Sequence, residues 1–238
     1  MKIEGCVALV TGANRGLGKA IVSALVEAGA AKVYATARDE RTVSTGGSPV
    51  VPLTLDVTKP EQVAAAVQKA GDISLLINNA GVLNSFNVLA ASQEELDADF
   101  RVQVHGTLSV IRAFLPVLER APRDATIVNV LSLASLAGFP ALGGYSASKA
   151  AAYSITQSLR PELKKKHIDI LAALPGPIDT DMVKDLAIPK TSATDTAKGL
   201  LAGIVRGDEE IFPDPMAREM GALWNKSYKE YERAFASF

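Results

Sequence analysis

The stretch of sequence that decides the fold is Cys6-Val7-Ala8-Leu9-Val10-Thr11-Gly12-Ala13-Asn14-Arg15-Gly16-Leu17-Gly18. It begins with a short apolar run typical of a buried strand, and residues 17–28 follow with helical apolar spacing that ends at Gly29. Between the two, glycines let the backbone turn tightly and approach a pyrophosphate at the N-terminus of the helix. A glycine-rich turn by itself is weak evidence, so its place between the first strand and the first helix carries the prediction.

The alternation of strands and helices continues along the chain. Apolar runs predict further strands at residues 32–37, 50–57, 73–78, 125–131, 168–174 and 210–212. Helices are predicted at 61–70, from 92 to about 118, at 144–165 and at 195–205, the first two opened by capping boxes at Thr58-x-x-Glu61 and Ser92-x-x-Glu95. Nearly continuous apolar strands separated by amphipathic helices require a parallel sheet covered on both faces. We therefore expect a single domain over residues 1–238, a doubly wound α/β fold of the Rossmann type with a mostly parallel sheet.

Two segments in the C-terminal third have other patterns. Residues 181–192 have weak periodicity and follow the end of a strand, which predicts a substrate lid. The aromatic residues Trp224, Tyr228, Tyr231 and Phe235 recur at helical spacing. They predict one final helix that packs on the core, or alternatively covers a subunit contact.

Composition excludes several classes of protein. The chain has 238 residues, 48% hydrophobic and 21% charged, which excludes general disorder, and a net charge of −1 argues against nucleic acid as a partner. The uncharged residues 125–148 contain glycine, proline and asparagine, so they indicate a strand and a loop rather than a membrane span. With one cysteine and no secretory signal, we expect a soluble, cytoplasmic protein. His105 and His167 lack a metal or triad pattern, so no metal is expected.

The end of the second predicted strand bears on the choice of dinucleotide. It reads Val33-Tyr34-Ala35-Thr36-Ala37-Arg38, with no carboxylate where NAD-binding folds place one for the ribose 2′-hydroxyl. Arg38 stands there instead, and a guanidinium suits bidentate contact with a 2′-phosphate. Arg15 in the glycine turn can approach the same group from the other side. The two arginines together predict NADP(H) rather than NAD(H).

Three further residues form a pattern suited to acid–base chemistry. Tyr145 and Lys149 lie four residues apart at the start of a predicted helix, so their side chains share one face. A free phenol has a pKa of about 10, and an adjacent ammonium lowers that value. We therefore expect Lys149 to lower the pKa of Tyr145. Ser132 ends the fifth strand, at the edge where open α/β sheets bind ligands, and its hydroxyl can hold a substrate oxygen.

These residues resemble the short-chain dehydrogenases and reductases over nearly the whole chain. The counterparts of the family's motifs are the glycine turn, Asn78-Asn79-Ala80-Gly81, Ser132, Tyr145-x-x-x-Lys149 and Pro175-Gly176. The resemblance implies that Tyr145 is the general acid/base, that Lys149 tunes its pKa and binds the nicotinamide ribose, and that Ser132 orients the carbonyl. It implies a cofactor site made of Gly12, Asn14, Arg15, Gly16, Leu17, Gly18, Arg38, Asp56, Val57, Asn78, Ala80, Gly81, Tyr145, Lys149, Pro175, Gly176, Ile178 and Thr180. Asn79 is expected to brace the sheet.

Two positions depart from the family pattern. Gln103, kept here as a candidate catalytic residue, stands where members usually have the Asn that holds a water in a proton relay to the lysine. Either the water survives in a displaced position, or solvent reaches Lys149 by another route. Pro161 lies in the helix that carries Tyr145 and Lys149, about three turns beyond the lysine, where it can kink the helix.

The leading hypothesis is an NADP-dependent oxidoreductase that interconverts a carbonyl compound and its alcohol, in a homodimer or homotetramer. The expected lining residues Leu133, Phe139, Leu142 and Met182 favour a small, mainly apolar ketone, aldehyde or secondary alcohol. One alternative is a non-catalytic NADP-binding or sensor protein, which Gln103 favours. Another is a different nucleotide-binding enzyme such as a methyltransferase, which shares only the glycine turn.

Overall fold

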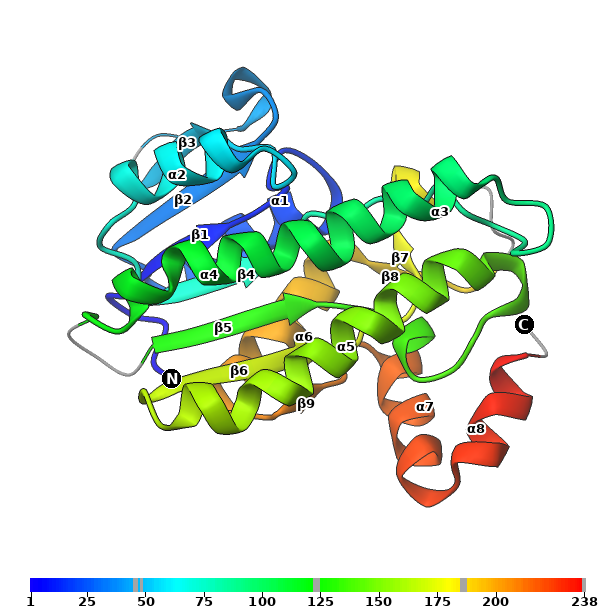
Figure 1. Cartoon of the computed structure of the whole chain (residues 1–238). Coiled ribbons are helices and arrows are strands. Elements are labelled where there is room, and N and C mark those ends of the chain that lie inside the picture. Colours follow the sequence, from blue (N-terminus) through cyan, green and yellow to red (C-terminus); the bar gives the residue numbers. More distant parts are fainter. Residues whose placement is uncertain (45–46, 48, 122–124, 185–187, 237–238) are drawn as a thin grey trace.

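The sheet at the centre of the molecule confirms the predicted fold class. The computed structural model describes residues 1–44, 47, 49–121, 125–184 and 188–236 (Figure 1). Within these residues a seven-stranded sheet has the order β3-β2-β1-β4-β5-β6-β9, and every neighbouring pair is parallel. Its strands are β1 (Val7–Val10), β2 (Lys32–Ala37), β3 (Val50–Thr54), β4 (Leu75–Asn78), β5 (Ala125–Val130), β6 (Ile168–Ala173) and β9 (Glu210–Ile211). This is the doubly wound α/β arrangement.

Helices cover both faces of this sheet. One face carries α1 (Gly16–Glu27) and α6 (Ala193–Arg206), and the other carries α2 (Pro60–Lys69), α4 (Thr107–Leu118) and α5 (Gly143–Lys164) (Figure 1). Each face has its own apolar core, represented by Ile21 and Leu200 on one side and by Phe114 on the other. Burying a side chain of this size contributes about 1.5–3 kcal/mol, so both layers are held to the sheet mainly by apolar contact.

One of the two expected capping boxes is wrong. Ser92 and Glu95 cap each other's backbone at the start of α3 (Gln93–Phe100), as predicted. At α2 the N-cap residue is Lys59 and Pro60 begins the helix. Thr58 instead donates its hydroxyl to Asp56 at 2.7 Å. The proline, pre-set for the first helical turn, moves the helix start past the threonine.

The long helix expected up to residue 118 contains an irregular turn. Between α3 and α4, residues Arg101–Gly106 form a π-helical segment, η2. Gly106 packs closely on Val57, a residue that follows β3. A Cβ on Gly106 would lie 2.7 Å from Val57 Cγ2. Such segments widen a helix locally and re-aim its side chains, and this one holds Gln103. In contrast, α5 continues past Pro161 to Lys164.

The aromatic residues near the C-terminus belong to two helices rather than one. These are α7 (Pro215–Lys226) and α8 (Tyr228–Phe235), separated by Ser227, whose side chain accepts a hydrogen bond from Glu230 N and caps α8. Serine favours this N-cap position over a helix interior, which explains the break. Tyr231 and Phe235 are buried, as expected of a face packed on the core, whereas Tyr228 is exposed and does not belong to that face.

The predicted lid begins and ends in a small sheet of its own. In it β7 (Ile178–Asp179) pairs in parallel with β8 (Thr191–Ser192), and a 3-10 turn, η5, covers Asp181–Val183. Residues 185–187 of the segment lie outside the described residues. In Figure 1 the carboxyl ends of the central strands, the β7–β8 pair and the α7–α8 pair lie on the same side of the molecule. Across the part of the chain described, no helix combines the length and apolarity needed to span a membrane.

Candidate active site

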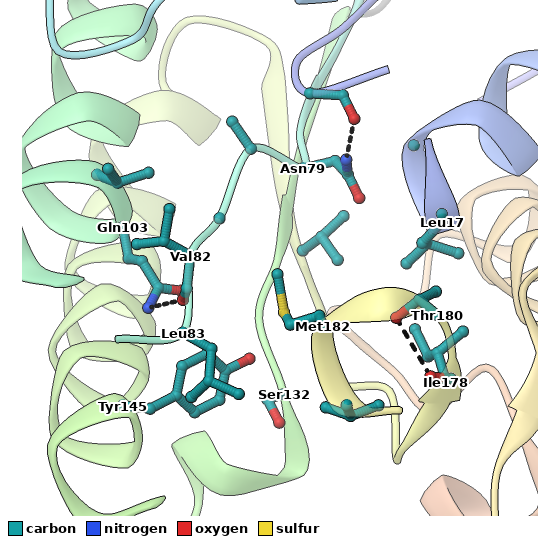
Figure 2. Close-up of a pocket in the computed structure, with 18 of the residues that line it drawn as sticks. Leu17, Asn79, Val82, Leu83, Gln103, Ser132, Tyr145, Ile178, Thr180 and Met182 are labelled. Carbon is teal, nitrogen blue, oxygen red and sulfur yellow. Dashed lines mark hydrogen bonds between the residues drawn. The ribbon is translucent and has the colours of Figure 1, made fainter. Parts of the chain in front are cut away.

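A cavity of about 720 Å³ lies at the carboxyl ends of the strands, and Figure 2 shows its interior. It extends from the glycine turn to α8. The predicted site residues that line it are Gly12, Asn14, Arg15, Gly16, Leu17, Gly18, Arg38, Asp56, Val57, Ala80, Gly81, Gln103, Ser132, Tyr145, Lys149, Pro175, Gly176, Ile178 and Thr180. The fold therefore brings together residues from both ends of the chain in one pocket.

The glycine turn is shaped by close backbone approaches. Gly12 has φ +64°, and a Cβ there would lie 2.9 Å from Ala80 Cα. A Cβ on Gly18 would lie 2.1 Å from the Gly12 carbonyl oxygen. Asn79 donates its amide to the carbonyls of Thr11 and Gly12 at 2.9 and 3.0 Å, bracing this turn. Figure 2 draws one of these two hydrogen bonds. The turn leaves the first N–H groups of α1 without a side-chain cap, an arrangement suited to a phosphate.

Asn78 is the one predicted cofactor residue that does not line the cavity. It is buried, and its amide donates to Asn129 Oδ1 at 2.9 Å. Asn129 donates in turn to Thr156 on α5 at 2.9 Å. The last residue of β4 thus directs its side chain toward β5 and α5, where it links these elements, and its role in holding the cofactor stays a prediction.

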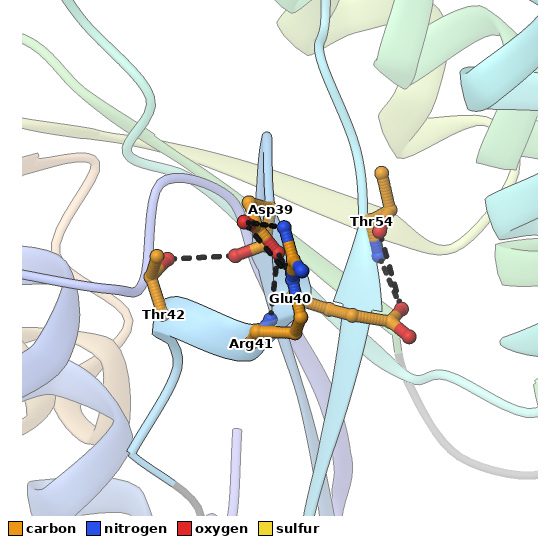
Figure 3. A network of polar contacts seen from close by, with 5 residues as sticks. All are labelled: Asp39, Glu40, Arg41, Thr42 and Thr54. Carbon is orange, nitrogen blue, oxygen red and sulfur yellow. Dashed lines mark hydrogen bonds and ion pairs between the residues drawn. The ribbon is translucent and has the colours of Figure 1, made fainter.

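Arg38 directly follows β2, and the two carboxylates that come after it have other partners. Asp39 accepts from Arg41 through Nε at 2.9 Å and Nη2 at 2.8 Å, while Glu40 accepts from the backbone N of Thr54 at 3.0 Å (Figure 3). The hydrogen bonds from Arg41 hold the pKa of Asp39 below its usual value. Both acids that follow Arg38 are thus engaged elsewhere, and Arg38 lines the cavity.

Arg15, the second arginine of the predicted phosphate site, lies across from the lid. Its Nη1 is 3.4 Å from Asp181 Oδ2, and both side chains are exposed. An exposed pair at this distance contributes little to stability, so the guanidinium can exchange Asp181 for another anion. Both arginines line the same cavity, as their sequence positions predict.

Tyr145 and Lys149 project from the first turns of α5 into the middle of the cavity. Tyr145 lies beside Ser132, and the two hydroxyl-bearing side chains face the space that Met182 and Thr180 border from the other side (Figure 2). Lys149 donates from Nζ to the carbonyl oxygen of Val130 at 2.9 Å. Its Nζ lies 5.7 Å from the centroid of the Tyr145 ring.

The pKa of Tyr145 lies above its ordinary value in this structure, opposite in direction to the effect expected from Lys149. Burial raises the pKa of Tyr145 to about 12, against which the hydrogen bond with Ser132 acts. Burial also lowers the pKa of Lys149 to about 8, while the negative charge of Asp99 opposes that decrease. The physical reason is that both groups are desolvated and the ammonium is bonded to Val130, not to the phenol.

Gln103 braces the floor of the cavity. Its Nε2 donates to the carbonyl of Val82 at 3.2 Å, shown in Figure 2, and to Ser148 Oγ at 2.9 Å. Ser148 in turn donates to the carbonyl of Tyr145 at 2.7 Å. The other amide atom, Gln103 Oε1, is buried without a hydrogen-bond partner. It is therefore an acceptor available to a small polar group at the bottom of the site.

The far end of the cavity is apolar. The four lining residues that the sequence suggested, Leu133, Phe139, Leu142 and Met182, are all there. Met216 of α7 and Phe235 of α8 also line it, two residues that the sequence did not single out as lining residues. The Phe139 and Phe235 rings lie 5.4 Å apart at an interplanar angle of 47°. A contact of this kind between distant segments leaves no local pattern in the sequence.

Side-chain hydrogen bonds of Asp214 and Tyr231 hold the α7–α8 pair against this end. Asp214, buried at the N-cap of α7, accepts from Gly176 N at 2.8 Å and from Ala217 N at 2.9 Å. Tyr231 donates its hydroxyl to the carbonyl of Leu133 at 2.7 Å. The C-terminal helices are thereby tied both to the Pro175–Gly176 loop and to the segment after Ser132.

Comparison with known proteins identifies the family. A family model described as short chain dehydrogenase matches residues 6–190. The 3-oxoacyl-(acyl-carrier-protein) reductase of Thermotoga maritima is 34% identical over 196 residues, which cover 78% of this chain and 79% of that protein. A short chain dehydrogenase from Burkholderia cenocepacia, solved in complex with NADP, matches with 40% identity, a TM-score of 0.92 and 99% coverage of each chain. One from Burkholderia phymatum, in complex with NAD, has 26% identity, a TM-score of 0.84 and 96% coverage of each chain. The chain belongs to the short-chain dehydrogenase family and is an oxidoreductase.

Proposed function

We propose that the protein interconverts a small, mainly apolar carbonyl compound and its alcohol with NADP(H), and that Tyr145 is the acid/base. One observation carries the proposal: Tyr145, Ser132 and Lys149 line the middle of a cavity that has a phosphate-binding turn at one end and an apolar wall at the other. Such a cavity holds a dinucleotide and an apolar substrate on either side of the same hydroxyl groups.

The residues of the dinucleotide end fit NADP(H). The glycine turn and the start of α1 suit the pyrophosphate, and Arg38 and Arg15 suit a 2′-phosphate. The engagement of Asp39 by Arg41 supports the choice, because a free carboxylate beside Arg38 would repel that phosphate. The NADP complex of the 40% identical Burkholderia protein supports it further.

The catalytic roles follow from the position and charge of each side chain. When bound, the nicotinamide supplies or accepts a hydride. The Ser132 hydroxyl donates to the carbonyl oxygen and holds it beside Tyr145, which transfers its proton to that oxygen as the alcohol forms. A pKa of about 12 keeps this proton on Tyr145 at neutral pH, as an acid requires. The ammonium of Lys149 stabilises the resulting phenolate and holds the nicotinamide ribose.

The substrate class follows from the wall opposite the glycine turn. Leu133, Phe139, Leu142, Met216 and Phe235 offer apolar surface there. A substrate that carries charge would lose its hydration against this wall without finding a partner. A ketone, aldehyde or secondary alcohol with an apolar body pairs its single oxygen with Ser132 and Tyr145 and leaves the rest in apolar contact.

The test is nicotinamide absorbance during turnover of apolar aldehydes, ketones and secondary alcohols, each with NADP(H) and with NAD(H). We expect turnover that prefers NADP(H) and that falls by about 10²- to 10⁴-fold in Tyr145→Phe. The matched control is Tyr153→Phe, which removes a hydroxyl from the same helix where it bonds Glu210 outside the cavity. NADPH binding without turnover of any substrate would instead support the sensor function.

The proposal extends to the organisation of the protein. We infer that residues 1–238 form one catalytic domain, that 181–192 act as a lid over the substrate, and that the enzyme is a cytoplasmic homodimer or homotetramer without nucleic acid or membrane partners. Mass measurement of the purified protein in solution tests the oligomeric state, and a monomer would contradict it.

A further inference from the structure

Asp99 is a buried acid beside the site that the mechanism above does not use. It lies on α3 with 0% of its surface exposed. Its Oδ1 accepts from Asn84 N and Nδ2, each at 3.0 Å. Its Oδ2 accepts from Ser85 N at 3.1 Å and from Ser85 Oγ. An ionised carboxylate, which only accepts, matches this set of donors, and bonds to a charged acceptor are the stronger kind.

The turn that Asp99 holds packs directly on the start of α5. Tyr145 N donates to the carbonyl of Ser85 at 3.3 Å. A Cβ on Gly144 would lie 2.3 Å from Ser85 Oγ, so no space separates the turn from the helix. The N-cap residue of α5, Leu142, offers no side-chain cap. The Asn84–Ser85 turn therefore takes the place of a cap and fixes the residue that begins the acid–base pair.

Asp99 is also distinguished from the other charges around α5. The elements packed against α5 are α3, η2, β6 and the short turns η3 (Leu133–Ser135) and η4 (Pro140–Leu142). Their titratable groups are Glu94, Glu95, Asp97 and Asp99 on α3, Arg101 and His105 on η2, and Asp169 on β6. Among these described groups Asp99 alone is buried, since Asp169 is half-buried and paired with Lys164 and the others are exposed. On α5 itself, Lys149 and Tyr145 lie in the surroundings of Asp99, and the charge of Asp99 acts on both.

We propose that Asp99 is a positioning residue of this active site, which holds the Asn84–Ser85 turn against the start of α5, under Tyr145, and places a buried negative charge beside the acid–base pair. A buried ammonium is stabilised by a compensating negative charge. The backbone carbonyl of Val130 offers only a dipole. The carboxylate of Asp99 provides the full charge from the neighbouring helix.

The first experiment measures kcat/KM against pH in wild type and in Asp99→Asn. Because it requires turnover, this experiment rests on the proposed function. Lys149 loses its proton as the pH rises through about 8, which sets the alkaline limb. Without the negative charge the ammonium is less stable, so the limb moves to lower pH by about one unit. The control Asp97→Asn removes the same charge from the exposed side of α3 and leaves the limb in place. An unmoved limb in Asp99→Asn would overturn the proposal.

A second variant separates the positioning role of Asp99 from the effect of its charge. Ser85→Ala deletes one hydrogen bond to Asp99 and retains the carboxylate. We expect kcat to fall several-fold while the alkaline limb stays where it is in wild type. Unchanged kcat would contradict the positioning role, and a displaced limb would contradict the assignment of the charge effect to Asp99.

A third measurement does not depend on catalysis. Asp99→Asn is made both in wild type and in Lys149→Met, and the melting temperature of all four proteins is measured at pH 7. In wild type the substitution leaves a buried ammonium without its counter-charge, whereas Lys149→Met has no ammonium to compensate. We expect the larger loss of melting temperature in wild type. Equal losses, including failure of both to fold, would overturn the charge pairing even if no substrate is found.

Discussion

The two ends of the cavity are built in different ways. At the glycine turn the shape is set by the backbone: Gly12 and Gly18 allow approaches that any Cβ would block, and Asn79 locks them. At the other end the wall is made of side chains from separate segments, including Phe139 before α5 and Phe235 near the C-terminus. The first end lies within the family match at residues 6–190 and the α7–α8 part of the second lies outside it. Backbone-built sites leave a motif in the sequence, and walls of packed side chains do not.

The largest effect is expected when one methyl group is added to the glycine turn, which tests whether the backbone shapes this end of the cavity. In Gly18→Ala the new Cβ would lie 2.1 Å from Gly12 O and 2.5 Å from Asn79 Nδ2, so the turn must shift. We expect NADPH affinity to fall by about 100-fold or more, since the phosphate site depends on these N–H groups. Fluorescence titration of NADPH measures the effect.

The control for this substitution is Gly138→Ala, where a Cβ would meet nothing within 4 Å. We expect its NADPH affinity and stability to equal those of wild type. If Gly18→Ala bound NADPH normally, the turn would not be the phosphate site, and the backbone-built half of the comparison would be wrong.

Side chains also contribute to cofactor binding at the glycine-turn end of the cavity, and substitution of Arg38 measures this contribution. A charged hydrogen bond is worth about 1.5–3 kcal/mol, so Arg38→Ala should weaken NADPH binding by about 10- to 100-fold and leave NADH binding unchanged. The control Arg41→Ala removes an arginine that is bonded to Asp39. Because it frees that carboxylate beside Arg38, it should weaken NADPH binding by a smaller factor. Equal loss for NADH and NADPH in Arg38→Ala would remove the 2′-phosphate assignment.

Much of the fold could be predicted because each element has a local pattern. The apolar runs gave β2 (Lys32–Ala37) with its exact bounds, and the parallel sheet followed from strands buried on both faces. Ser92 and Glu95 formed the predicted capping box because their reciprocal hydrogen bonds span only three residues. At α2, Thr58 favours the N-cap position and Pro60 favours the first helical position, and the helix begins at Pro60.

The features that sequence reasoning missed depend on contacts between distant residues. Asn78 donates to Asn129, which is 51 residues away, and this hydrogen bond directs the Asn78 side chain toward β5. Asp214 joins Gly176 across 38 residues. The pKa of Tyr145 rises because burial outweighs its neighbours, and burial is a property of the assembled fold. Motifs located the acid–base residues, while the environment that tunes them required the structure.

The smallest effect is expected at the substrate wall, where Phe235→Ala tests the side-chain-built end. Deleting the ring opens space beside Phe139, at the opposite end of the cavity from the glycine turn. We expect kcat/KM for a bulky apolar ketone to rise by about tenfold relative to a small one, in the range that one pocket contact confers, with NADPH affinity unchanged. Tyr228→Ala, on the same helix but exposed, should leave the ratio as in wild type. A constant ratio in Phe235→Ala would mean that α8 supports the fold without shaping the substrate site. Selectivity would then be set by the family-matched residues, and the distinction between the two ends of the cavity would be lost.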